Sequence, residues 1–174
     1  MSPRRKSLTA DLVGIIRSKP IAREDLVAAS HFVLDTVACV IGGQATTPGR
    51  ILLDWFESPG DPGRAAFLAS GLAHILEIDD LHRDSVTHPG AVVIPPAWYL
   101  ARRRGCSGRE FLNAVLHGYE AMTRVGMAVG HGHYKVWHNT STCGPFGAAM
   151  VCATLLELDD EQTVWALGNA GTQS

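Results

Sequence analysis

SGREFLNAVLHGYEAMTRV, residues 107–125, is the stretch of sequence that decides the fold class. Ser107 and Glu110 open it with the spacing of a capping box, in which each side chain accepts a hydrogen bond from the other residue's backbone N–H. Apolar residues then recur three and four positions apart, at Leu112, Val115, Leu116, Tyr119, Met122 and Val125. That period places them on one face, so the stretch predicts a long amphipathic helix.

Helical periodicity continues on both sides of this stretch. It predicts further helices over 8–17, 23–40, 48–57, 65–80, 95–104 (entered through two prolines), 142–156, and onward from a second capping box at 159–162. Gly42-Gly43 is expected to end the second of these helices. Loops are expected over 58–63, 81–89 and 130–139. Since no convincing alternating strand is present, the sequence predicts an all-α fold, a helical bundle in which residues 1–174 form a single domain.

Composition narrows the class of protein. The chain has 174 residues, a formal net charge of −2, 46% hydrophobic residues and 18% charged residues. Its length and apolar content are those of a globular domain with a packed core, not of a disordered segment. The near-neutral net charge argues against a nucleic-acid partner, because a protein that binds nucleic acid needs a basic face. The one internal basic run, 102–104, is expected to be the last turn of a helix, where cations complement the helix dipole.

The cysteines and the N-terminal segment bear on the compartment. Cys39, Cys106, Cys143 and Cys152 form no CxxC pair, so we expect free thiols in a reducing cytosol. The N-terminal basic residues precede no long apolar segment, and no run of about 18 uninterrupted apolar residues occurs. We therefore expect a cytoplasmic protein with no membrane partner.

Residues 74–88 carry the first candidate chemistry. Four carboxylates and three histidines fall within these fifteen positions. On a continuous helix His74, Glu77 and Leu81 would share a face. Grouped carboxylates push pKa values apart, and histidine is the usual proton carrier near neutral pH. A solvated, charged loop is one alternative, and a divalent-cation site is another. We expect no metal, because the chain has no HExxH motif, no calcium-loop motif and no Cys/His pairing.

The second candidate is the segment 131–142. His131-Gly132-His133 can chelate a metal, although a surface loop is the commoner outcome. His138 precedes Asn139-Thr140-Ser141-Thr142, which is typical of a helix N-terminus. The positive end of a helix dipole suits an anion such as a carboxylate, and a capped helix without a ligand is the alternative. The motifs of serine hydrolases and of dinucleotide-binding proteins are absent from the sequence.

Several blocks, in order along the chain, resemble the MmgE/PrpD family. They are Leu34-Asp35-Thr36, Ala73-His74 to Asp79-Asp80, Thr87-His88-Pro89-Gly90 to Pro95, Gly118-Tyr119-Glu120, Trp137-His138-Asn139-Thr140 to Ala149, and Ala166 to Gln173. The family includes 2-methylcitrate dehydratase, cis-aconitate decarboxylase and iminodisuccinate epimerase. The resemblance implies an enzyme without metal or cofactor that moves a proton at a carbon next to a carboxylate of a small polycarboxylate. It also implies a helical first domain, a second α+β domain that this chain lacks, and a homodimer.

The resemblance also implies roles for individual residues. It implies catalytic roles for His88, His138, Asp80 and Glu77, with Glu77 standing where relatives often carry Asp. We expect substrate binding by Asp79, His82, Thr140 and Lys135. Relatives carry a longer stretch where this chain has 58–63.

Three functions are compatible with this sequence. The first is a lyase, a dehydratase or decarboxylase, present as a fragment or as one half of a split enzyme. The second is a short relative repurposed as a biosynthetic cyclase or isomerase. The third is a non-catalytic dimerisation or interaction module. In each case we expect a homo-oligomer, or a partner chain that supplies the missing part.

Overall fold

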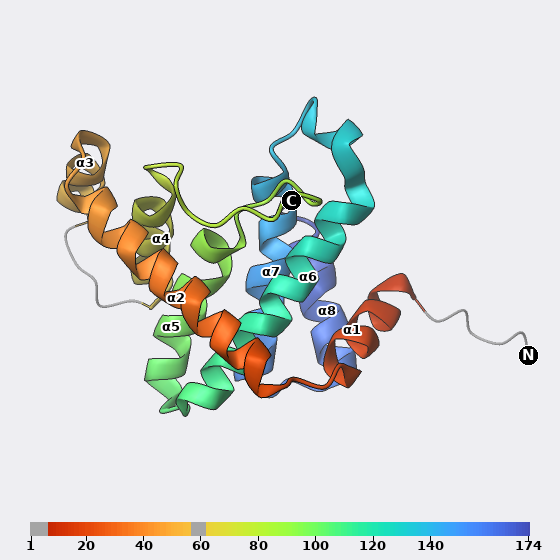
Figure 1. The fold of residues 1–174 in the computed structure, drawn as a ribbon. Helices are drawn as coiled ribbons and strands as arrows, with labels where there is room; N and C mark the ends of the chain where they lie inside the picture. Colours follow the sequence, from red (N-terminus) through yellow and green to blue (C-terminus); the bar gives the residue numbers. More distant parts are fainter. Residues whose placement is uncertain (1–6, 57–61) are drawn as a thin grey trace, which may run out of the picture.

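The computed structural model describes residues 7–56 and 62–174, and in these ranges it consists of helices joined by short loops (Figure 1). The helices are α1 (Leu8–Ser18), α2 (Arg23–Gln44), α3 (Thr47–Trp55), α4 (Pro62–His74), α5 (Pro89–Arg104), α6 (Gly108–Tyr134), α7 (Asn139–Leu155) and α8 (Asp160–Ala170). Within the described ranges the only β feature is an isolated bridge between His82 and Thr87. The predicted all-α fold is confirmed.

The two capping boxes and the basic last turn lie where the sequence predicts them. Ser107 caps α6, its N–H donating to Glu110 Oε2 at 2.7 Å, and the equivalent box at Asp159 opens α8. Gly105 ends α5 in the left-handed region with φ of 69°, directly after the basic last turn 102–104. These capping groups satisfy backbone donors and acceptors that a bare helix end leaves unpaired.

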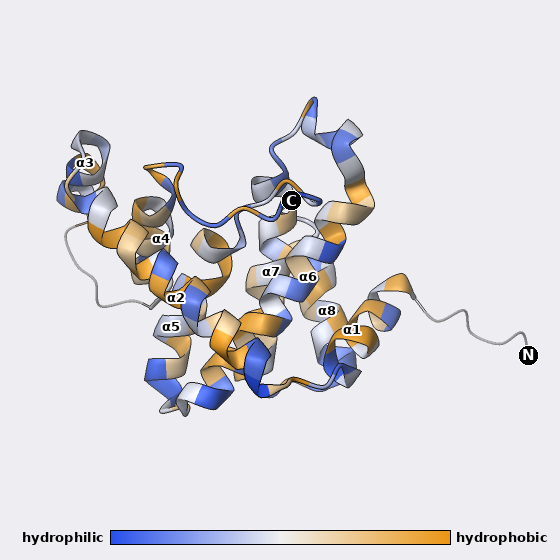
Figure 2. Ribbon diagram, viewed as in Figure 1, coloured by the Kyte–Doolittle hydropathy of each residue, from blue (hydrophilic) through white to orange (hydrophobic). Residues whose placement is uncertain are grey.

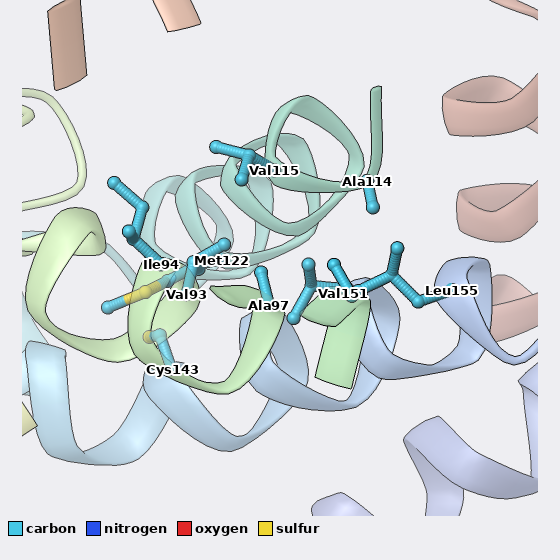
Figure 3. Close-up of a cluster of buried hydrophobic side chains, with 10 residues drawn as sticks. Val93, Ile94, Ala97, Ala114, Val115, Met122, Cys143, Val151 and Leu155 are labelled. Carbon is cyan, nitrogen blue, oxygen red and sulfur yellow. The ribbon is translucent and has the colours of Figure 1, made fainter. Parts of the chain in front are cut away.

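The central core lies between α5, α6 and α7 (Figure 3). Gly118 of α6 and Gly147 of α7 face each other at close range: a Cβ built on either one would lie 3.1 Å from the carbonyl oxygen of the other. This approach brings the buried side chains of the three helices into one cluster. Its labelled members in Figure 3 are Val93, Ile94, Ala97, Ala114, Val115, Met122, Cys143, Val151 and Leu155.

Gly42-Gly43 does not end α2, which corrects the sequence-based boundary: the helix continues to Gln44. The reason is a close contact with α4. A Cβ on Gly43 would lie 2.1 Å from the backbone oxygen of Leu72. Glycine is thus used here to let two helix backbones touch, and the packing of α2 against α4 outweighs its weak helix propensity.

α2 is also the one helix in the described ranges long and apolar enough to cross a membrane by length and composition. The core helices of globular proteins pass the same test, and α2 packs against α4, α5 and α6. Apolar residues recur along it in Figure 2, and several of them are exposed: Val27, Leu34, Val37 and Ile41.

The ends of α4 and α5 also differ from prediction. α4 stops at His74 instead of continuing to residue 80, and Glu77 has a left-handed φ of 54°. α5 starts at Pro89 instead of Pro95. Pro89 occupies the first turn, where its missing N–H costs nothing, whereas Pro95 and Pro96 lie inside the helix. The irregular segment 75–88 that results carries the candidate site.

The remaining differences are local. α6 continues to Tyr134 through a kink at Gly130, where φ is 69° and ψ 178°, so the loop predicted over 130–139 shrinks to 135–138. α3 ends at Trp55, and its predicted last residue, 57, lies outside the described residues. The loop predicted over 58–63 falls partly outside them as well, and its last two residues begin α4. The four cysteines are free thiols, as predicted.

Candidate active site

A buried carboxylate lies at the centre of the candidate site. The side chain of Asp79 has no solvent exposure. Its two oxygens lie 3.0 and 3.1 Å from Nδ1 of His74, and Oδ1 lies 3.5 Å from Nδ1 of His88. One carboxylate therefore faces two imidazoles, whose rings it can orient.

The chain reversal after α4 produces this arrangement. His74 is the last residue of α4, and its backbone oxygen accepts from the N–H of Glu77 at 3.1 Å. The left-handed Glu77 then turns the chain so that Asp79 points back at His74. Glu77 Oε1 lies 3.4 Å from Nε2 of His74, but the Glu77 side chain is 70% exposed. His74 thus has a carboxylate beside each ring nitrogen.

Asp80 anchors the same turn to two helices. Its N–H donates to Asp35 Oδ2 of α2 at 3.2 Å, and its Oδ1 accepts from the N–H of Gly90 in α5 at 2.8 Å. A Cβ on Gly90 would lie 2.5 Å from Asp80 Oδ1 and 2.6 Å from Thr36 Oγ1. Glycine at position 90 is therefore needed for Asp80 to reach the start of α5.

Burial raises the pKa of Asp80, and the nearby carboxylates of Asp79 and Asp35 raise it further, while the Gly90 N–H and the Tyr119 hydroxyl lower it. Burial also raises the pKa of Tyr119, with Asp80 as the next cause. The anchor is therefore a buried acid whose neutral form the fold favours.

The loop that leads to His88 is held in place by hydrogen bonds. His82 and Thr87 exchange backbone hydrogen bonds of 2.9 and 3.3 Å, and Nδ1 of His82 lies 2.8 Å from Ser85 Oγ. From α7, the amide of Asn139 donates to the backbone oxygen of Ser85 at 2.8 Å. His82 is thus engaged in holding the loop, and the loop delivers His88 in a fixed position.

Two helices begin at this point, each with a histidine at its N-cap position. His88 is the N-cap of α5 and His138 is the N-cap of α7. Thr140 Oγ1 accepts a hydrogen bond from the backbone N–H of His88 at 3.1 Å, so the two N-termini are tied together. The positive ends of two helix dipoles consequently meet at the site, which favours an anionic ligand.

An open hollow of about 450 Å³ lies at this junction. The ring of His74 is 6.2 Å from that of His138 and 4.8 Å from that of His88, measured between centroids. Of these three, His74 and His138 line the hollow, and His88 lies behind with Asp79. The lining residues are His74, Val92, His138, Thr140, Ser141, Gly144, Pro145 and Ala148.

A model of the MmgE/PrpD N-terminal domain matches residues 9–174. The chain belongs to the MmgE/PrpD family. It is also similar to the cis-aconitate decarboxylase-like protein oryM of Aspergillus oryzae, at 28% identity over 194 residues. That match covers 97% of this chain and 40% of oryM, so the chain spans less than half the length of this curated relative. The family expected from the sequence blocks is confirmed.

The structure brings together most of the site residues expected from the MmgE/PrpD resemblance. Thr140 lines the hollow, but its hydroxyl is also bonded to the N–H of His88. Lys135 is the exposed C-cap residue of α6. The sequence assigns His74 no role, yet its ring lies close to those of both other histidines. His74 lies beside Asp79 because the chain reverses direction at Glu77. The continuous helix predicted over 65–80 has no such reversal.

Proposed function

We propose that this MmgE/PrpD family member acts in a lyase reaction on a small polycarboxylate. The reaction is the transfer of a proton at a carbon next to a carboxylate, without a cofactor, and it ends in dehydration or decarboxylation. The observation that carries the proposal is the Asp79-centred group of histidines at an open hollow between two helix N-termini. The name of the relative oryM, a cis-aconitate decarboxylase-like protein, favours a tricarboxylate and loss of CO₂.

Recognition of the substrate rests on charge. Each substrate carboxylate is an anion, and the hollow is bounded by the first turns of α5 and α7. Backbone N–H groups and helix dipoles there bind carboxylates without a cationic side chain. The exposed Lys135, which follows the end of α6 in the short loop before α7, is our candidate for a further carboxylate contact when substrate is bound.

Proton transfer is assigned to the histidines. In a dehydration, one imidazole removes the proton next to the carboxylate and a second gives a proton to the departing hydroxyl, which leaves as water. In a decarboxylation, CO₂ departs and a protonated imidazole supplies the proton to the carbon. We assign these roles to His88 and His138, with His74 between them and Asp79 orienting both His74 and His88.

Asp80 and Glu77 receive different roles in this proposal. Asp80 is a positioning residue, because its carboxylate accepts a hydrogen bond from the N–H of Gly90 and lies beside Tyr119. Asp80→Asn keeps that acceptor, so its turnover should stay within a few-fold of the natural chain. Glu77 is exposed beside His74 and could exchange protons with it.

We place the reaction in the cytoplasm, where the four free thiols would persist. Because the chain covers 40% of oryM, we further propose that full turnover needs residues from a second copy or a partner chain. The exposed apolar side chains of α2, which include Leu34 and Ile41, offer a surface for that assembly.

The test is carbon–hydrogen exchange. The full chain is incubated in deuterated water with a panel of dicarboxylates and tricarboxylates, and NMR follows loss of the proton next to a carboxylate. We expect exchange or product formation with at least one tricarboxylate, and loss of either with His138→Ala. The control is His31→Ala, an exposed histidine on α2. If neither exchange nor product is seen with any candidate, for the chain alone or combined with a partner chain that supplies the missing part, the proposed activity is wrong and a non-catalytic interaction module is favoured.

A further inference from the structure

We propose that His74, Asp79 and His88 form a binding site for one divalent transition-metal ion, with Zn²⁺ the best match. Two imidazoles and one carboxylate are a ligand set that proteins use for zinc with an open fourth position. One ligand atom from each of the three residues lies within 4.8 Å of the others. The three side chains are already assembled around Asp79, whose carboxylate is buried.

The distances agree with a shared ion. Zinc bonds of about 2.0–2.2 Å in a tetrahedral site hold neighbouring donor atoms about 3.4 Å apart. Asp79 Oδ1 lies 3.1 Å from Nδ1 of His74 and 3.5 Å from Nδ1 of His88. These two distances lie on either side of that spacing, so the donor atoms are close to the positions that a shared ion requires.

An unpaired ring nitrogen is the second, independent observation. Nδ1 of His88 is buried, and among the described residues it has no hydrogen-bond partner, although it points at Asp79. A buried polar atom left unpaired destabilises the folded chain, and such atoms call for an explanation. A metal ion between His88 and Asp79 would satisfy this nitrogen, the carboxylate and His74 together.

The surroundings support the ligands. Metal-binding histidines usually give their other ring N–H to a carboxylate, which fixes the ring. Glu77 Oε1 occupies that position, 3.4 Å from Nε2 of His74. His74 also lines the hollow, which places one of the three ligands beside space open to solvent.

The site shares His88 with the proton transfer proposed above, and it shares Asp79, which orients His88. A bound ion would occupy Nδ1 of His88 and engage Asp79, so the metal-bound form would be inactive. This consequence rests on the proposed function. The binding itself does not, because it is measured without substrate.

The experiment is calorimetric titration of the full chain with Zn²⁺ in chelator-free buffer. We expect one ion per chain, and affinity reduced more than about tenfold in each of His74→Ala, Asp79→Asn and His88→Ala. The control is His131→Ala, which removes an exposed histidine of the His131-Gly132-His133 motif and should leave the affinity unchanged. Thermal unfolding of each variant reports whether it folds.

Either of two results would overturn the site: no zinc binding by the natural chain, or equal affinity in the folded triad variants. Co²⁺ provides a check on the natural chain alone. A four- or five-coordinate site should give intense visible absorption, and the weak spectrum of the hydrated ion would also contradict the proposal. A chain that binds no zinc can still catalyse carbon–hydrogen exchange, and a chain without exchange activity can still bind zinc. The two experiments therefore test the two proposals separately.

Discussion

The backbone N–H of His88 donates a hydrogen bond to Oγ1 of Thr140, 52 positions away in sequence and 3.1 Å away in space. This bond joins the N-cap of α5 to the first turn of α7. It therefore sets the relative position of the two helix N-termini between which the hollow lies. Thr140 is buried, with 6% of its surface exposed, so water cannot readily replace it.

Replacing Thr140 by valine should destabilise the chain by about 1–3 kcal/mol, because the N–H of His88 loses its acceptor inside the protein. Thr140→Ser keeps the hydroxyl and should cost clearly less. Urea unfolding at neutral pH measures both variants. Equal losses in the two would show that the bond does not hold the helices together.

Gly43→Ala should destabilise the chain by several kcal/mol, since the new Cβ would lie 2.1 Å from the Leu72 carbonyl oxygen and force α2 away from α4. Gly14→Ala is the matched control, because Gly14 is exposed in α1 and no atom lies within 4 Å of the position of its Cβ. Alanine there should stabilise by about 0.5–1 kcal/mol. Thermal unfolding compares the two variants, and a stable Gly43→Ala chain would refute the close contact.

Asp80 should make stability depend on pH in a defined direction. Its pKa is raised in the folded chain, chiefly by burial, so the stability linked to its protonated form is fully present below the ordinary pKa and lost as pH rises through the folded value. Asp80→Asn cannot ionise and keeps the acceptor for Gly90. The difference in unfolding free energy, variant minus natural chain, should rise between about pH 3 and pH 7.

The measurement is urea unfolding of both chains across that pH range. Asp80→Ala serves as the control, because it removes the acceptor as well as the charge and should be destabilised at low pH too. A difference that stays flat or falls with rising pH would contradict the account of Asp80.

The fold could be predicted to the extent that its signals are local. The capping box of Ser107 and Glu110 acts within one turn, and so it was readable from sequence. Gly42-Gly43 resembles a helix end in the sequence. The contact that explains Gly43 is with Leu72, which lies in a distant part of the chain. Pro95 and Pro96 looked like a helix entry, although Pro89 already provides one.

Most residues of the candidate site could be predicted from the sequence, but their arrangement in space could not. His138 could be singled out because it precedes a helix-opening pattern, and His88 could be singled out through the resemblance to the MmgE/PrpD family. The place of His74 opposite Asp79 depends on the left-handed backbone of Glu77, and a non-glycine residue with positive φ has no reliable sequence signal. The period of a continuous helix therefore places Glu77 beside His74, as the structure does, but it misses Asp79.

The central claim is that Asp79 and the histidines around it carry the proton transfer. The direct test is the rate of carbon–hydrogen exchange in deuterated water for the natural chain, His88→Ala and Asp79→Asn, on the most reactive polycarboxylate. We predict that His88→Ala slows exchange by about 100-fold or more, which is the usual contribution of an acid–base group, and that Asp79→Asn slows it to a smaller extent. Exchange that proceeds at the natural rate in folded His88→Ala would contradict the claim.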